Sequence, residues 1–344
     1  MDISIIIVNW NSAEHLRNCL KSIYQVPMGK SLEVVVVDNA SYDGAEKMIG
    51  EQFSQVRFVQ SDQNLGFARG NNLGVRSSSG RVLVFLNPDT LVSASGIAQI
   101  AENLESLADA GAMGCKILNA DGTLQTSAVQ SFPTILNQAL DFERLRQKFP
   151  NSHLWGMGSL FSSSNAPLPV EMISGACIAV RRNVFEQVGE FSSEYFMYGE
   201  DVDLCKKIWI SGWKIYYLPA TSIVHLGGQS TKLRESSDFS TVCLQESMQT
   251  YVSKFHGTAY SIAYRLSRVV MALFRTIVLI SFTVLGGNPE TKRARSASLR
   301  KWWTVFCWSI GIKKLGNSGT FSSSGQAGPA SKPVTARPSN SGIV

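Results

Sequence analysis

Three acidic side chains, Glu200, Asp201 and Asp203, fall within four positions of the segment GEDVDL. At a helix start, acidic groups complement the helix dipole by about 0.3–1 kcal/mol each, which accounts for one or two of them. The apolar residues at 196–198 precede them, and an apolar setting raises the pKa of a carboxyl group toward that of a general base. The pattern therefore indicates either helix capping or a catalytic carboxylate.

A further carboxylate, Asp89, follows the apolar stretch VLVFL in the tripeptide NPD. At a strand end it would face a crevice suited to a divalent cation that bridges two phosphates, because hard cations prefer oxygen ligands. Asn-Pro is also a common turn initiator, so the tripeptide alone leaves both interpretations open. His225 is similar: a lone histidine is often a packed or surface residue, but imidazole is also a common metal ligand.

Apolar, β-branched stretches predict buried parallel strands at 3–8, 33–37, 56–59 and 82–86. Helices are expected between and after them, at about 12–25, 43–52, 66–78 and 94–108. Asn11 and Glu14 have capping-box spacing at the first helix. This alternation predicts an α/β fold with a Rossmann-like, mostly parallel sheet flanked by helices.

Polar residues follow all four predicted strands: Asn9 and Asn11, Asp38 and Asn39, Asn64 and Gly66, Asn87 and Asp89. Asn and Asp favour turns in any case. Ligands of open α/β sheets, however, bind beyond the carboxyl ends of the strands. Polar residues after every strand favour a ligand-binding rim.

The second half of the chain is less regular. Residues 121–168 carry Pro and Ser, which predicts loops with one helix near 135–147. Further elements are expected as a strand near 176–180, a helix near 183–188, a helix from Glu200 to about 210 and a strand at 213–218. Residues 316–344 are rich in Gly, Ser and Pro, which predicts a disordered tail.

Composition excludes several protein classes. With 344 residues, 44% hydrophobic and 17% charged, the chain can bury a real core and is neither a fibrous nor a disordered protein. Its six scattered cysteines lack C-x-x-C or zinc spacing, which fits a reducing compartment. The start MDISIIIVNW lacks the basic region and cleavage site of a signal peptide, so it is expected to be a first strand.

Positive charge is concentrated near the C-terminus. Residues 264–314 hold ten Lys and Arg and one acidic residue, whereas residues 1–263 hold 20 basic and 25 acidic ones. On a helix, Arg265, Arg268 and Arg275 fall within an arc of roughly 80°, which predicts one basic edge on an otherwise apolar helix lying in a membrane interface.

Tryptophans support the same interpretation of this segment. Trp302, Trp303 and Trp308 lie between basic residues, as in membrane-surface segments. A basic helical hairpin packed on the catalytic domain is the alternative. The segment is too apolar, and too poor in base-reading side chains, for nucleic-acid binding.

Seven blocks together resemble the family 2 glycosyltransferases of GT-A fold: IIIVNWNSAEHLRNCLKSI, VVVVDNASYDG, NLGFARGNNLG, VLVFLNPD, SGACIAVRR, FMYGEDVDLCKKI and VHLGG. The greatest similarity is to the bacterial rhamnosyltransferase-type branch that builds cell-surface polysaccharide. The resemblance covers about residues 1–230, with every block in family order.

The resemblance implies a nucleotide-sugar site formed by Val8, Asn9, Asn11, Asp38, Asn64, Gly66, Asn71 and Asn87. Asp38 is implied to accept a hydrogen bond from the pyrimidine N3–H. Asp89 and His225 are implied to bind Mg²⁺ or Mn²⁺, and Asn87 replaces the first acidic residue of the family's D-x-D motif. Asp201 matches the general base, and Glu200 and Asp203 either position acceptor hydroxyls or cap the helix.

The implied activity is inverting sugar transfer, with dTDP-rhamnose as the expected donor and a polyprenyl-diphosphate-linked saccharide as the acceptor. The expected domains are a catalytic domain (1–230, nucleotide-sugar half 1–120 and acceptor half 121–230), a helical connection (231–263), a membrane-associating segment (264–314) and the tail (315–344). An anionic membrane surface at the cytoplasmic face of the bacterial inner membrane is the expected location.

Three alternatives bear on this interpretation. A UDP-hexose donor fits the same residues, and a nucleotide-sugar-binding membrane protein without turnover is more remote. A dinucleotide-dependent dehydrogenase is excluded because VNWNSAEH, rather than G-x-G-x-x-G, follows the first strand. The sequence leaves the oligomeric state open.

Overall fold

The computed structural model describes residues 1–25, 29–227, 238–284 and 289–315. Within these residues, nine strands form the main sheet, in the order β3-β2-β1-β4-β10-β6-β11-β5, with β8 paired to β11. The strands are β1 (Ile3–Asn9), β2 (Leu32–Asp38), β3 (Arg57–Gln60), β4 (Val82–Leu86), β5 (Thr90–Leu91), β6 (Ala110–Leu118), β8 (Leu168–Val170), β10 (Cys177–Arg181) and β11 (Lys214–His225).

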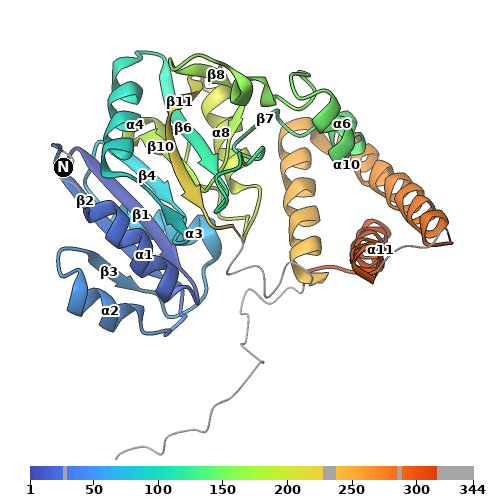
Figure 1. The fold of residues 1–344 in the computed structure, drawn as a ribbon, viewed down its shortest axis with the longest axis horizontal. Helices are drawn as coiled ribbons and strands as arrows, with labels where there is room; N and C mark the ends of the chain where they lie inside the picture. The colour runs from blue at the N-terminus through green and yellow to red at the C-terminus, as the bar shows by residue number, and fades with distance from the viewer. Residues whose placement is uncertain (26–28, 228–237, 285–288, 316–344) are drawn as a thin grey trace, which may run out of the picture.

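The first half confirms the predicted α/β alternation. β1, β2, β3 and β4 pair in parallel, and β1 is buried along its whole length, as its continuous apolar run requires. The helices of this half are α1 (Ala13–Tyr24), α2 (Ala45–Gln52), α3 (Gly66–Arg76) and α4 (Ala94–Ser106). α3 packs on β1 and β2, while α4 packs on β6, β10 and β11 (Figure 1).

The second half adds antiparallel pairings to the predicted mostly parallel sheet, although β11 also pairs in parallel with β6. β10 runs antiparallel between β4 and β6, and β11 pairs antiparallel with β5 and β8, so the sheet is mixed. β10 is antiparallel because it starts beside the end of β4, where Cys177 pairs with Leu86, and returns along that strand. Two helices of this half, α7 (Arg182–Gln187) and α8 (Glu200–Ile210), lie close to their predicted positions.

The predicted capping box at Asn11 is wrong. Asn11 has a left-handed backbone (φ 50°), and α1 begins at Ala13 with Ser12 as its N-cap. The cap comes instead from a distant carboxylate: Asp43 Oδ2 accepts hydrogen bonds from the amides of Ser12 and Ala13, both at 2.8 Å. The α1 N-terminus is therefore tied to the loop after β2.

Residues 121–168 contain more structure than predicted. The single helix expected near 135–147 is two short helices, α5 (Ile135–Ala139) and α6 (Glu143–Lys148), and a 3₁₀ helix, η1 (Met157–Phe161), follows them. A small antiparallel sheet joins β7 (Val129–Gln130) to β9 (Met172–Ile173).

The C-terminal part forms a helical hairpin beside the sheet domain (Figure 1). α10 (Asp238–Val284) bends at Gly257, where φ is 80°, and packs against α11 (Pro289–Ser309). α10 therefore crosses the expected boundary between 231–263 and 264–314. Among the described helices, none is both long and apolar enough to cross a bilayer. The predicted disordered tail at 316–344 lies outside the described residues.

The three arginines expected to form an exposed basic edge of α10 face the protein instead. Arg265 donates to the carbonyls of Trp308 and Ser309 at 3.0 and 2.9 Å. Arg268 is buried, and Arg275 donates to the carbonyl of a residue in the α5–α6 connection. The prediction was wrong about the face because helical periodicity groups side chains but does not say which group meets the protein.

The outward face of α10 is apolar. After the bend at Gly257, seven of its large apolar side chains are exposed: Ile262, Leu266, Val270, Leu273, Phe274, Ile277 and Ile280. Their spacing of three and four residues forms one stripe along the helix. Two of the three tryptophans of α11, Trp302 and Trp308, are buried, whereas Trp303 is exposed.

Candidate active site

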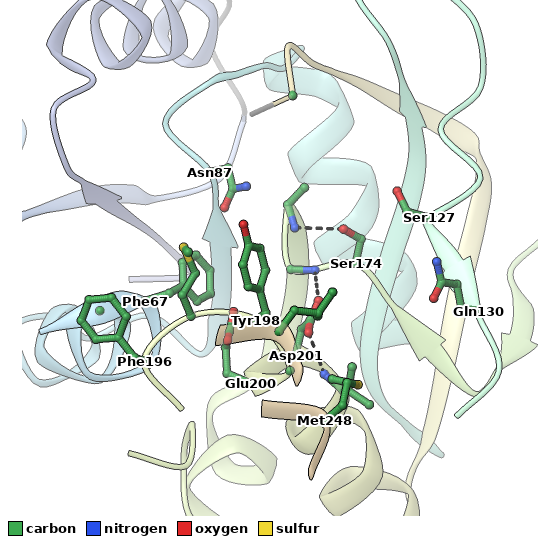
Figure 2. A pocket seen from close by; sticks show the side chains of 18 of the residues that line it. Phe67, Asn87, Ser127, Gln130, Ser174, Phe196, Tyr198, Glu200, Asp201 and Met248 are labelled. Carbon is green, nitrogen blue, oxygen red and sulfur yellow. Dashed lines mark hydrogen bonds between the residues drawn. The ribbon is translucent and has the colours of Figure 1, made fainter. Parts of the chain in front are cut away.

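A cavity of about 810 Å³ opens at the carboxyl ends of the central strands. Its walls come from the strand ends of the first half, the start of α8, the β7–β9 region and the C-terminal hairpin. Figure 2 shows Asp201 between Asn87, which follows β4, and Met248 of α10. Eight residues predicted from the sequence line it: Val8, Asn64, Gly66, Asn87, Asp89, Glu200, Asp201 and His225.

The Asp201 side chain is held by two backbone amides. Its Oδ2 accepts from Gly175 N and its Oδ1 from Val202 N, both at 2.9 Å (Figure 2). Burial raises the pKa of this carboxyl above its ordinary value, and the two amide hydrogen bonds oppose that shift. Asp201 is thus oriented, ionisable and within a cavity large enough for a substrate.

Its neighbour Glu200 is a different kind of acid. Its Oε2 is buried and has no hydrogen-bond partner among the described residues. Burial, and then repulsion from Asp201, raise the pKa of Glu200 to about 8. Burial and the neighbouring carboxylate therefore favour the protonated form of Glu200.

A close contact between two loops brings the strand rim to these acids. Gly66 has φ of 76°, and a Cβ there would lie 2.2 Å from the carbonyl oxygen of Phe196. The same oxygen accepts from Phe67 N at 2.9 Å, and Tyr198 nearby has a left-handed backbone with φ of 69°. Only glycine fits at position 66, so the NLGF segment lies directly against the loop that precedes Asp201.

Asp89 and His225 meet although they are 136 positions apart. His225 Nε2 lies 3.3 Å from Asp89 Oδ1 and 3.3 Å from Asn87 Nδ2. On the other side of the ring, Gln125 Nε2 donates to the His225 carbonyl at 2.8 Å, which orients the amide so that Oε1 accepts from Nδ1–H at 3.1 Å. In the neutral ring, Nε2 is then an unprotonated acceptor that faces a carboxylate oxygen.

The Asn87 amide is placed to donate to Nε2, and a cation bound beside Nε2 and Asp89 Oδ1 would satisfy both acceptors. Burial opposes ionisation of Asp89, but the hydrogen bond and charge of His225 outweigh it and lower the pKa of Asp89. Within the described residues, no three His, Cys, Asp or Glu side chains converge on one point. The donor set thus fits a Mg²⁺ or Mn²⁺ ion that takes its remaining ligands from phosphate oxygens and water.

Asp38 and Asn9 lie beneath the rim rather than in the cavity wall. The Asp38 carboxylate is buried and accepts from Asn9 Nδ2 at 2.7 Å, Gln60 Nε2 at 2.9 Å and both the amide and hydroxyl of Ser41. Burial opposes its ionisation, but these hydrogen bonds lower the pKa of Asp38. The carboxylate expected to meet a base is therefore already well supplied with donors.

Three more predicted residues are also outside the cavity lining. Asn71 donates to the carbonyl of Phe67 at 2.9 Å within α3, and Asn11 is exposed at the start of α1. Asp203 is fully buried, with Lys254 Nζ of α10 at 2.7 Å and the hydroxyl of Ser192 at 2.6 Å. For Asp203 the geometry favours the packing alternative, since this ion pair joins α8 to α10.

Several lining residues were not predicted. Trp10 and Asn39 adjoin predicted rim residues, and the Asn39 amide donates to the Gly66 carbonyl at 2.9 Å. Asn39 stood in the polar pattern after the second strand, which is the signal that identifies it. Further lining residues come from segments that the sequence analysis did not assign to the site, among them Gln125, Ser127, Gln130, Ser174, Gly175, Met248, Arg268, Arg275, Lys301 and Trp302.

The sequence profile described as "Glycosyl transferase family 2" matches residues 4–189, more than half of the chain. The chain belongs to glycosyl transferase family 2. This confirms the resemblance seen in the sequence and makes the protein a glycosyltransferase. The matched segment contains the rim residues that follow β1–β4, whereas α8 with Asp201 and β11 with His225 lie beyond it.

Two of the relatives of this glycosyltransferase are named as rhamnosyltransferases. It is 28% identical over 240 residues to the N-acetylglucosaminyl-diphospho-decaprenol L-rhamnosyltransferase of Mycobacterium tuberculosis, covering 66% of this chain and 76% of the relative. It is 24% identical over 230 residues to the rhamnosyltransferase WbbL of Escherichia coli (strain K12), covering 64% and 82%.

Among solved structures, the mannosyltransferase PcManGT from Pyrobaculum calidifontis, in complex with GDP-Man and Mn²⁺, matches with a TM-score of 0.54 at 18% identity. The match covers 90% of this chain and 84% of that one. At this identity the likeness shows the fold, which is a mixed α/β, GT-A-like fold.

Proposed function

We propose that this glycosyltransferase is an inverting, metal-dependent enzyme that moves L-rhamnose from dTDP-rhamnose to a lipid-linked saccharide in surface-polysaccharide synthesis. The observation that carries the proposal is one cavity that contains both the oriented Asp201 carboxylate and the Asp89–His225 pair. Relatives named as rhamnosyltransferases support the donor, and the relative named for a decaprenol-diphosphate substrate supports the acceptor class.

In the proposed reaction, Asp201 takes the proton of an acceptor hydroxyl as that oxygen attacks the anomeric carbon of the donor sugar. The new C–O bond forms on one face, while the bond to the diphosphate breaks on the other and leaves its electron pair on the phosphate oxygen, which inverts the configuration. The amides of Gly175 and Val202 hold the Asp201 carboxylate in place, so the carboxylate needs little reorientation when it accepts the proton.

Asp89 and His225 would hold the divalent ion, which when bound supplies positive charge for the departing diphosphate. Gln125 keeps the His225 ring turned so that Nε2 faces Asp89. Asn39, Asn64 and Asn87 offer amide groups along the rim for the phosphates and sugar of the donor.

We place the protein at the cytoplasmic face of the bacterial inner membrane, held by the part of the hairpin that belongs to the proposed membrane-associating segment, 264–314. The apolar stripe of α10 exposes Leu266 and Ile277 by 61% and 62%, which suits insertion among acyl chains. Lys292, Arg293 and Arg300 of α11 are exposed and suit anionic headgroups. The surface therefore combines apolar area with positive charge, as an anionic bilayer requires.

The test is release of nucleoside diphosphate from a panel of dTDP- and UDP-sugars, with membrane lipid extract as acceptor. Release from dTDP-rhamnose that stops with a chelator, returns with Mg²⁺ or Mn²⁺ and is lost in Asp89→Asn would support the proposal. Release from a UDP-sugar instead would keep the chemistry and replace the donor. Nucleotide-sugar binding without release from any donor would favour the non-catalytic alternative.

A further inference from the structure

The cavity does not end at the catalytic acids. It continues to the C-terminal hairpin, where Arg268 and Arg275 of α10 and Lys301 and Trp302 of α11 line it. All four lie beyond residue 189, where the family match ends. The hairpin thus forms one wall of the same cavity that holds Asp201.

The contacts of Arg275 hold its guanidinium group in a fixed position and leave one of its nitrogens without a hydrogen-bond partner among the described residues. Its guanidinium lies over the Trp302 ring, 4.4 Å from the centroid, and over the Phe142 ring at 4.0 Å. One nitrogen donates to the Asp141 carbonyl at 2.6 Å, but Nε is buried and has no hydrogen-bond partner among the described residues. The side chain is held in place while part of its donor capacity is unused.

Positive charge at this end exceeds negative charge. Arg268 donates to the side-chain oxygen of Gln245 at 3.0 Å, and within the described part of the chain Arg268, Arg275 and Lys301 form no ion pair with a carboxylate. The acid of this wall, Asp141, pairs with Arg146 at 3.3 Å. Three unpaired cations in a partly enclosed cavity favour a ligand with two or more negative charges.

The position of these cations indicates which molecule carries the anion that they would bind. The donor diphosphate is proposed beside Asp89, and Figure 2 shows Asp201 between Asn87, which follows β4, and Met248 of α10. Leu273 and Phe274, which directly precede Arg275, are exposed on the apolar stripe of α10. An anion bound at Arg275 is therefore adjacent to a surface suited to a hydrocarbon chain.

We infer that Arg275 and Lys301, supported by Arg268 and Trp302, form the binding site for the diphosphate of the lipid-linked acceptor. The inference rests on the proposed function and deepens it. The acceptor sugar then points to Asp201, the diphosphate contacts the hairpin, and the lipid chain leaves along the stripe of α10. The hairpin is part of the substrate site as well as the proposed membrane contact.

The test compares two acceptors on the full-length protein with dTDP-rhamnose: GlcNAc joined through a diphosphate to a short prenyl chain, and octyl GlcNAc, which lacks phosphate. Lys301→Gln is the main variant because Lys301 is exposed and its loss leaves the fold intact; Arg275→Gln is the second. Arg300→Gln is the matched control, since it removes the same charge from the adjacent exposed position outside the cavity lining.

We expect Lys301→Gln and Arg275→Gln each to raise KM for the diphosphate acceptor about tenfold, with KM for the donor and for octyl GlcNAc unchanged. Arg300→Gln should match wild type. An equal effect of Arg300→Gln, an equal effect on octyl GlcNAc, or no effect of Lys301→Gln would overturn the inference.

Two further measurements separate the possible causes. Vesicles containing phosphatidylglycerol should bind Lys301→Gln as well as they bind wild type, because Lys301 is assigned to the cavity rather than to headgroups. Weaker vesicle binding of Lys301→Gln than of wild type would assign the lysine to headgroups and overturn the inference. Calorimetric titration with the diphosphate compound needs no turnover. If wild type transfers no sugar, the proposed function fails, whereas a tenfold weaker Kd in Lys301→Gln still supports the anion site.

Discussion

Replacing Asp201 by Asn tests the assignment of the general base. The amide oxygen of Asn still accepts from one of the two backbone amides, Gly175 N or Val202 N, but its NH₂ group faces the other. One charge-assisted hydrogen bond worth about 1.5–3 kcal/mol is lost, and removal of a buried charge offsets part of that cost. The variant should fold, with the midpoint of thermal unfolding within a few degrees of wild type.

Catalysis should fall far more than stability. A positioned general base contributes about 10²–10⁴-fold, so kcat should drop by that factor, or about 3–5 kcal/mol in activation free energy. The assay is steady-state release of nucleoside diphosphate at saturating acceptor, with donor binding measured by calorimetry and expected to be unchanged. In wild type, activity should fall as the pH drops through the raised pKa of Asp201, because the base must be ionised.

Asp203→Asn is the matched control for this substitution. It removes a buried carboxylate two positions along the same helix, outside the cavity lining, where it pairs with Lys254. We expect it to lower stability and to keep kcat within about threefold, since a surviving fold retains Asp201. A kcat for Asp201→Asn within tenfold of wild type, or an equal loss in Asp203→Asn, would refute the assignment.

Three further predictions concern stability and membrane binding. The pKa of Glu200 is raised from 4.5 to about 8 in the folded state, so its contribution to stability is lost as pH rises through that interval. The free energy of unfolding of Glu200→Gln, measured in urea, should therefore match that of wild type at pH 5 and exceed it at pH 9 by at most about 5 kcal/mol. Gly66→Ala should lower the free energy of unfolding by at least about 3 kcal/mol, because its Cβ meets the Phe196 carbonyl. Gly44 also has a positive φ of 89°, but a Cβ there would lie in open space, so Gly44→Ala should cost only about 1–2 kcal/mol. Equal unfolding midpoints for the two variants would contradict the steric argument. Leu266→Asp should weaken binding to phosphatidylglycerol vesicles, measured by flotation, at least tenfold. Ile210→Asp, at an equally exposed position on α8, should leave vesicle binding unchanged. An equal effect of the two substitutions would contradict a membrane contact through α10.

Much of the first half was predictable because its information is local. The four apolar runs correspond to β1–β4 within a residue or two. β1, β2 and β4 are largely buried, as continuously apolar strands must be, whereas β3, predicted to be buried, lies at the sheet edge and is partly exposed. The rim at their carboxyl ends follows from the α/β topology, and eight predicted residues do line the cavity. Residue type and position along a strand were sufficient for the strands and the polar rim, whereas the site roles of Val8, Asp201 and His225 came from the family resemblance.

Other features depended on contacts between distant segments. Packing between elements far apart in the chain determines that Asp43 rather than Asn11 caps α1. It also determines that Asp203 pairs with Lys254 while Asp201 faces the cavity. A sequence pattern places acids on a helix, but it does not say which acid meets a cation from another helix.

By itself, the sequence determined the family, the parallel first half of the sheet and the residue types of the catalytic rim. Only the tertiary structure decided that β10 enters the sheet antiparallel, and that Arg268 and Arg275 turn inward while the apolar stripe of α10 turns out. The physical reason is that periodicity fixes which side chains share a face, whereas the direction of that face depends on whether another part of the chain covers it.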